Sequence, residues 1–216
     1  WWAWTQFTWA LNAANTNLHE IRLGTLISTA VAFVMAVSIS GAFGDQALWF
    51  GGSYVLVRIL GLGLYYRVAA HDPEQQRGVR TFAFASLLGL GLVIVGALTP
   101  PSARPWVWLG VVVFDVVAAF VAGRHGSWNL NAGHFAERHG LIVIIALGES
   151  LIVAGAGVDI GRHGTALLVD GLLAVVATCL LWWTYFGWAK DALEKRLESV
   201  KAHDEEALAR DAYSLG

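Results

Sequence analysis

The chain has 216 residues, of which 56% are hydrophobic and only 14% are charged, and its formal net charge is −2. Soluble domains usually carry about 25% charged residues, so this composition, with a mean hydropathy of +0.57, excludes an ordinary soluble protein. We expect a membrane protein whose surroundings are lipids, with no nucleic-acid partner. The single cysteine, Cys179, excludes an intramolecular disulfide.

Apolar stretches along the chain predict an all-α fold, a polytopic transmembrane helical bundle. A helix needs about 17 to 25 residues to cross a hydrocarbon core about 30 Å thick. The chain opens with a partial span, Trp1 to Ala14, which has no initiator Met and no charged n-region, so we interpret the chain as a fragment. The six full spans are predicted at residues 22–42, 47–66, 81–98, 106–123, 134–156 and 164–189.

Basic residues near span ends predict the orientation, because an excess of Lys and Arg marks the cytoplasmic side. One set of alternate connections carries only Arg104 and Arg162. The other set carries many more and should be cytoplasmic: Arg22, Arg67, Arg77, Arg80, Arg124, Arg138 and the five basic residues from Lys190 onward. We therefore predict two parts, a transmembrane bundle at residues 1–189 and a charged cytoplasmic or interfacial helix at 190–216.

A polar turn, which includes Asn12 and Arg22, follows the partial first span. One interpretation is a capped, solvated loop. The other is that amides such as that of Asn12 form hydrogen bonds across the bundle or line a polar vestibule.

Two opposite charges are predicted at similar depths in different spans. At 1.5 Å per residue, Arg58 lies about 17 Å and Asp115 about 14 Å from the outer ends of their helices. We predict that they form a buried ion pair, because removing one partner would strand the other at a cost of about 3 to 5 kcal/mol. The pair either holds two helices in register or has a functional role.

The segment from His134 to Ser150 places several ionisable residues in one apolar stretch. On a helix, Arg138 and Glu149 fall within roughly 20° of one stripe. A charged side chain in a bilayer costs about 2.5 to 3.5 kcal/mol, so Glu149 should face the bundle interior or a wet cavity, or else bond to a neighbouring helix as a lone carboxyl. Asp170, on the next antiparallel span, is its expected partner; the two carboxyls would share a proton or bind a cation.

Four polar residues at the cytoplasmic end of this span would line the inner mouth of such a cavity: His134, Glu137, Arg138 and His139. His134 and His139 diverge by about 140° on a helix, unlike the i,i+4 pair that converges on zinc. We therefore expect no metal and no cofactor. The sequence has no Gly-x-Ser-x-Gly, nucleotide loop or Cys pair, so we name no catalytic residue.

Several motifs together resemble the bacterial low-temperature-requirement A family: Trp1-Trp-Ala-Trp4, Asn12, Arg22, and above all His134-Phe-Ala-Glu-Arg-His-Gly140 continuing to Leu147-Gly-Glu-Ser150. The resemblance covers nearly the whole chain, which looks like the middle of a longer member. It implies a multi-spanning protein of the bacterial inner membrane. Family members often have acidic residues near Asn15 and Asn17, where this chain has amides. The family is named for a growth phenotype, so the resemblance brings no biochemical activity.

Three classes of function remain open from the sequence. The first is a transporter or channel for a small solute or ion, proton-coupled or not, with a polar cavity around Glu149. The second is an accessory protein that binds lipid, a partner protein or a second copy of itself without transport. The third is a membrane-embedded enzyme or cofactor binder.

Overall fold

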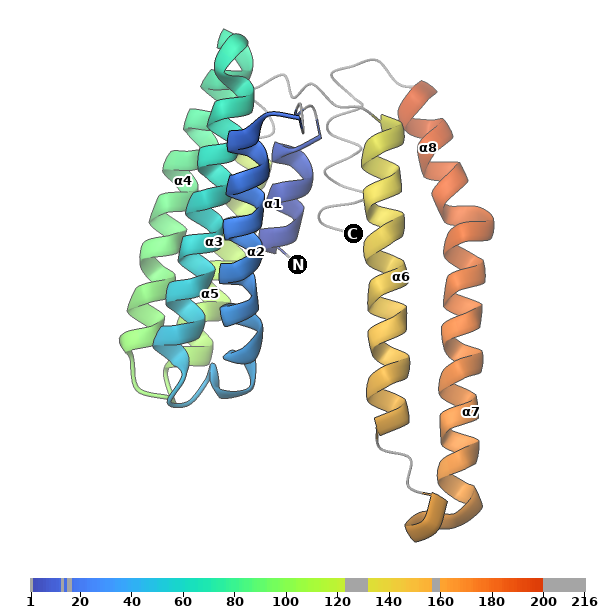
Figure 1. Ribbon diagram of the computed structural model, residues 1–216. Coiled ribbons are helices and arrows are strands. Elements are labelled where there is room, and N and C mark those ends of the chain that lie inside the picture. The colour runs from blue at the N-terminus through green and yellow to red at the C-terminus, as the bar shows by residue number, and fades with distance from the viewer. Residues whose placement is uncertain (1, 13, 15–16, 123–131, 157–159, 200–216) are drawn as a thin grey trace. The chain divides into compact units, whose positions relative to one another are not determined.

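The structure is a computed structural model, and it describes residues 2–12, 14, 17–122, 132–156 and 160–199. Every regular element in these ranges is helical, so the predicted all-α class is confirmed. The chain divides into two compact units, one containing the helices before residue 123 and the other containing those after residue 131 (Figure 1).

The first unit is a bundle in which α3 is the central helix. Its helices are α1 (Trp2–Ala10), α2 (His19–Val37), α3 (Ala47–Val68), α4 (Pro73–Leu98) and α5 (Arg104–Ala122). Helix α3 packs against α1, α2 and α4, and α4 packs against α5. The α2–α3 and α4–α5 connections lie at one end of this unit, and the α3–α4 connection lies at the opposite end (Figure 1).

Small residues allow these helices to approach closely, as is usual in membranes. A Cβ added at Gly24 of α2 would lie 2.7 Å from Leu64 Cδ2 of α3, and one at Gly51 would lie 3.2 Å from Ala97 Cβ of α4. Large apolar side chains remain exposed on the outside of the unit, including Leu26, Phe33, Phe84 and Trp106. Such an inside-out distribution suits a bundle surrounded by lipid rather than water.

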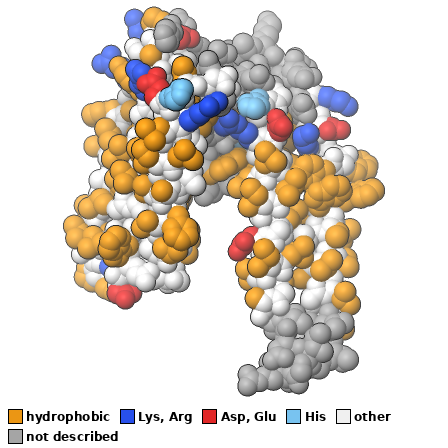
Figure 2. Space-filling model, in the orientation of Figure 1, with side chains coloured by type: hydrophobic (Ala, Val, Ile, Leu, Met, Phe, Trp, Pro, Cys, Tyr) orange, Lys and Arg blue, Asp and Glu red, His pale blue; other side chains and the backbone are white. Residues whose placement is uncertain are grey.

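The second unit is a helical hairpin. Helix α6 (Ala132–Ala156) packs against α7 (Ile160–Thr184), and a π-helical segment, Tyr185–Ala189, leads from α7 into α8 (Lys190–Ser199), which packs back on α6. Hydrophobic side chains cover much of the visible surface of this hairpin (Figure 2).

Five helices in the described ranges are long and apolar enough to cross a membrane: His19–Val37, Ala47–Val68, Gln75–Leu98, Gly133–Ala156 and Val169–Leu193. A sixth predicted span, residues 106–123, overlaps α5, whose side chains are described up to Val117. A multi-pass membrane protein is therefore supported, while the total of six full spans stays a prediction.

Two helix boundaries differ from the predicted spans. Helix α4 begins at Pro73, not near residue 81, so Arg77 and Arg80 lie on a helix and not in a loop. The Asp72 carboxylate caps its first turn by accepting a hydrogen bond of 3.2 Å from the Gln75 backbone N–H. Helix α2 ends at Val37, and a 3₁₀ turn, Ile39–Gly41, follows it where the span was predicted to continue.

The charged segment after residue 189 begins as a helix, as predicted, with α8 covering Lys190–Ser199. Residues 200–216 lie outside the described residues. The cytoplasmic or interfacial position of this helix stays a prediction.

Candidate functional site

Among the described residues of the first unit, Arg58 is the most enclosed charged residue, with 1% of its surface exposed. It lies in the middle of α3, a membrane-competent helix. Arginine cannot lose its proton in proteins, so Arg58 places a permanent positive charge inside the bundle.

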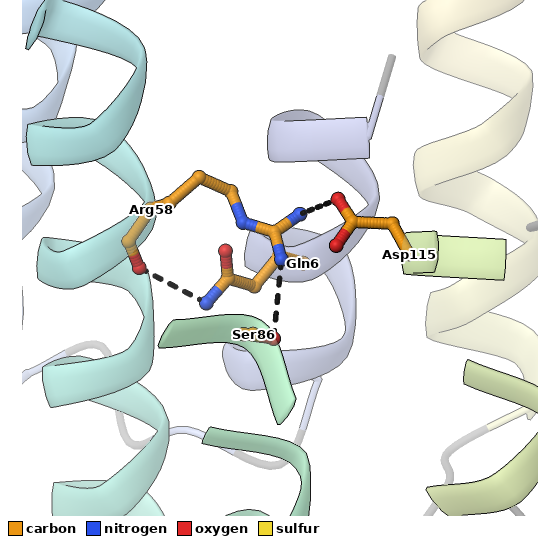
Figure 3. Close-up of polar contacts among 4 residues, drawn as sticks. All are labelled: Gln6, Arg58, Ser86 and Asp115. Carbon is orange, nitrogen blue, oxygen red and sulfur yellow. Dashed lines mark hydrogen bonds and ion pairs between the residues drawn. The ribbon is translucent and has the colours of Figure 1, made fainter. Parts of the chain in front are cut away.

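The structure brings Arg58 and Asp115 together. Asp115 projects from α5, is 7% exposed, and places Oδ2 3.9 Å from Arg58 Nη1 (Figure 3). A hydrogen-bonded Arg–carboxylate pair is usually about 2.7 to 2.9 Å apart. The two charges are therefore close enough to neutralise each other, but they do not share a short hydrogen bond.

Two further helices contribute neutral polar groups. Ser86 of α4 accepts a hydrogen bond of 3.3 Å from Arg58 Nη2, and Gln6 of α1 donates one of 3.1 Å from Nε2 to the Arg58 backbone carbonyl (Figure 3). The Tyr54 ring, one turn earlier on α3, lies 6.0 Å from the Arg58 guanidinium carbon. The polar site therefore consists of Gln6, Arg58, Ser86 and Asp115, with Tyr54 beside it.

Two glycines make room for this site. A Cβ at Gly89 of α4 would lie 2.8 Å from Asp115 Oδ1, and one at Gly61 of α3 would lie 3.1 Å from Gln6 Cδ. Both separations are shorter than Cβ atoms normally show, so a larger residue at either position would force the neighbouring polar side chain to shift.

Three buried polar atoms of the site have no hydrogen-bond partner among the described residues: Arg58 Nε, Arg58 Nη1 and Gln6 Oε1. Buried polar groups are paired in the great majority of cases. An enclosed guanidinium with unused donors is therefore an unusual feature.

A second buried arginine of the same unit differs in this respect. Arg104, 5% exposed at the start of α5, donates from Nη1 to the Gly44 carbonyl at 2.7 Å, from Nη2 to the Thr99 carbonyl at 2.9 Å and from Nε to the Gly96 carbonyl at 3.2 Å. Its donors clamp the two connections at that end of the bundle. Arg104 is thus a structural arginine whose guanidinium is bonded to backbone carbonyls, whereas the guanidinium of Arg58 has nitrogens without a hydrogen-bond acceptor among the described residues.

The two residues of the predicted polar turn lie in different environments. Asn12 follows α1 and is 7% exposed, so it is not part of a solvated loop, and its amide atoms have no hydrogen-bond partner among the described residues. Arg22 is exposed in the first turn of α2 and donates a 3.0 Å hydrogen bond to Asn17 Oδ1.

Glu149 and Asp170 are both exposed on the hairpin, on α6 and α7. Within the described part of the chain, neither a hydrogen bond nor an ion pair joins their carboxyls, so the predicted meeting of the two stays a prediction. Glu149 is surrounded on α6 by exposed apolar residues, with Ile145 63%, Ile152 66% and Val153 65% exposed.

The four predicted mouth residues follow one another in the first turns of α6. His134 Nδ1 lies 3.4 Å from Glu137 Oε2, and Arg138 is half-buried. His139 is 3% exposed, and its Nδ1 lies 2.8 Å from the Phe135 carbonyl. Two of the four therefore form a local pair and His139 is buried, while the mouth that the four were predicted to line stays a prediction.

No group of three or more His, Cys, Asp or Glu side chains is placed to hold a metal ion within the described ranges. That the protein works without a bound metal stays a prediction.

Sequence reasoning found Arg58 and Asp115 but missed Gln6 and Ser86. Each of the two is a polar residue within an apolar stretch, which was the available signal. Their common location depends on which helix faces meet, and this is a property of the tertiary structure.

Comparisons with known proteins agree with the resemblance seen in the motifs. The family model described as bacterial low temperature requirement A protein (LtrA) matches residues 1–216. The uncharacterized protein RA0937 of Rhizobium meliloti (strain 1021) is 25% identical over 197 residues, which cover 86% of this chain and 48% of that protein. The chain thus spans about half the length of this relative. No solved structure matches.

Proposed function

We propose that this chain, which belongs to the bacterial low-temperature-requirement A (LtrA) family, forms part of a transporter or channel for a small solute or ion. Its polar centre is the site made by Gln6, Arg58, Ser86 and Asp115. The observation that carries this proposal is that Arg58, although almost fully buried, leaves Nε and Nη1 without hydrogen-bond acceptors among the described residues.

In a purely structural ion pair, we would expect every N–H group of the arginine to have a hydrogen-bond acceptor. A buried charge that is incompletely paired costs roughly several kcal/mol in lost solvation. Arg104 shows how this chain satisfies a structural arginine, with backbone carbonyls around its guanidinium. The open donors of Arg58 suit a group that a solute contacts and then leaves. Intramembrane charges commonly mark solute and ion pathways.

Glu149 supports the same proposal from the second unit. Its carboxyl lies on an exposed apolar face of a helix that is long enough to span the membrane. In a bilayer that face cannot be wholly in contact with lipid, because a carboxylate there costs about 2.5 to 3.5 kcal/mol. We propose that Glu149 faces a polar cavity, with Asp170 of the same hairpin as its expected partner.

We also propose an orientation in the bacterial inner membrane. Lys and Arg side chains gather at the end of the first unit where α3 connects to α4 (Figure 2). Arg67 pairs with Glu20 there, and Arg77 and Arg80 follow on α4. The positive-inside rule makes this end cytoplasmic.

Flux measurements in liposomes test the proposal. Protein reconstituted into liposomes loaded with a pH-sensitive dye should change the internal pH when a gradient of a transported salt is imposed, across a panel of nitrate, formate, chloride, potassium and ammonium salts. The double variant Arg58→Met/Asp115→Leu, which removes both charges together, should abolish the response. A protein that only binds lipid or a partner would behave like empty liposomes with every salt and would refute the proposal.

The matched control is Gly63→Ala, on the same helix as Arg58. A Cβ at Gly63 would meet no atom within 4 Å, so this variant should behave as the unmodified protein does.

A further inference from the structure

The charges at the polar site are not equivalent, and this difference indicates which substrates it would accept. Arg58 is permanently positive, whereas a carboxyl such as Asp115 can become neutral by taking up a proton. Besides these two, the titratable side chain that faces the guanidinium among the described residues is Tyr54, which is neutral near pH 7. The contributing groups from α1 and α4, Gln6 and Ser86, carry no charge.

The site can therefore be electrically neutral in two alternative states. In the first, the Asp115 carboxylate balances Arg58, as the separation of 3.9 Å indicates. In the second, a bound monovalent anion balances Arg58 and Asp115 is protonated. A state with two negative charges beside one positive charge, or with an unbalanced Arg58, is expensive inside a bundle.

The unused hydrogen-bonding groups favour an anion with oxygen acceptors over a cation. Arg58 Nε has no hydrogen-bond partner within the described residues, and Nη1 faces the Asp115 carboxylate at 3.9 Å without a hydrogen bond to it. A cation would instead have to approach a fixed guanidinium charge. Guanidinium groups bind oxyanions strongly because their N–H groups combine charge with directional hydrogen bonds.

We propose that Arg58 binds a small monovalent oxyanion, of the class of nitrate, formate and bicarbonate, in place of the Asp115 carboxylate, and that Asp115 takes up one proton in the same step. The anion forms hydrogen bonds to Arg58, and the ion pair with Asp115 is released. One negative and one positive charge enter together, so the net charge of the site does not change. This inference rests on the proposed transport function and specifies its substrate as an anion accompanied by a proton.

Direct binding of nitrate to the full chain in lipid nanodiscs tests this inference separately from transport. Titration calorimetry in two buffers with different ionisation enthalpies counts the protons exchanged. We expect uptake of close to one proton per nitrate at neutral pH, and a dissociation constant that rises about tenfold for each unit of increasing pH. Formate and bicarbonate are measured in the same way.

Three variants make the result specific. Asp115→Asn, which resembles the protonated carboxyl, should bind nitrate with no proton uptake and with little dependence on pH. Arg58→Met/Asp115→Leu should not bind it. Arg104→Gln alters the structural arginine and should lower the thermal stability. The folded fraction of this variant should still take up one proton for each nitrate that it binds.

The inference is overturned if none of the three anions binds at millimolar concentrations, if nitrate binds without proton uptake, or if Arg58→Met/Asp115→Leu binds it equally well. If nitrate binds with a proton but no salt produces flux in liposomes, the transport proposal fails and the binding site stands. If liposomes carry another solute and no oxyanion binds, this inference alone fails.

Discussion

Arg58 Nη1 and Asp115 Oδ2 lie 3.9 Å apart between α3 and α5, in a part of the bundle where both side chains are buried. The distance is close enough for strong electrostatic attraction and too long for a charge-assisted hydrogen bond. A separated pair of this kind can be interrupted by a third group more easily than a hydrogen-bonded one.

The two partners should not be equally costly to remove. Asp115→Leu leaves a permanent charge unpaired, so we expect a loss of about 3 to 5 kcal/mol in the free energy of unfolding. Arg58→Met should cost less, because Asp115 can take up a proton and become neutral. Chemical unfolding in mild detergent, followed by Trp fluorescence, measures both, and the double variant should be more stable than Asp115→Leu. Equal losses for the two single variants would contradict this asymmetry.

Gly89 should be essential to the position of Asp115. Gly89→Ala would place a Cβ 2.8 Å from Asp115 Oδ1, so the carboxyl must move, at an expected cost of about 1 to 3 kcal/mol. The control is Gly91→Ala on the same helix, where a Cβ would meet nothing within 4 Å. Unfolding midpoints of the two variants compare them directly. If the Gly89→Ala protein were as stable as the Gly91→Ala protein, the site would tolerate a displaced Asp115 carboxyl, contrary to this prediction.

Glu149→Gln keeps the shape and hydrogen-bonding capacity of the side chain but removes its titration. We expect salt-driven flux of this variant to lose its pH dependence, because Glu149 is proposed to face a polar cavity. Ser150→Ala, which removes only a hydroxyl bonded to the Ala146 carbonyl, is the neighbouring control. Unchanged pH dependence in a normally expressed Glu149→Gln protein would make Glu149 a purely structural residue.

Orientation can be tested by cysteine labelling after Cys179 is replaced by Ala. Ser102, in the exposed turn between α4 and α5, should react as Ser102→Cys with an impermeant maleimide added to intact cells. Ala70, exposed in the 3₁₀ turn between α3 and α4, should not react as Ala70→Cys until the cells are opened. The reverse pattern would invert the proposed topology.

The sequence predicted the residues at the centre of the site better than it predicted the surroundings. Counting residues from the span ends placed Arg58 and Asp115 at similar depths, and depth is a one-dimensional property that a sequence records. It could not predict that Gln6 and Ser86 join them, because that depends on the rotation of α1 and α4 about their axes.

The start of α4 was missed although the sequence contained its signal. Asp72 followed by Pro73 is a favourable N-cap and first helical residue, and the Gln75 N–H bonds the Asp72 side chain as expected for such a cap. The charges of Arg77 and Arg80 led to a loop prediction, since charge marks exposure to water and does not exclude a helix. The meeting of Glu149 and Asp170, predicted from their places on adjacent antiparallel spans, stays a prediction.

The most direct test of the central claim is the internal pH of protein-containing liposomes after an inward nitrate gradient is imposed, with the membrane potential clamped at zero by potassium and valinomycin. The proposed mechanism predicts acidification of the interior that requires no net current, persists in Gly63→Ala and disappears in Arg58→Met/Asp115→Leu. Acidification no faster than in empty liposomes, or equally fast in the double variant, would contradict it.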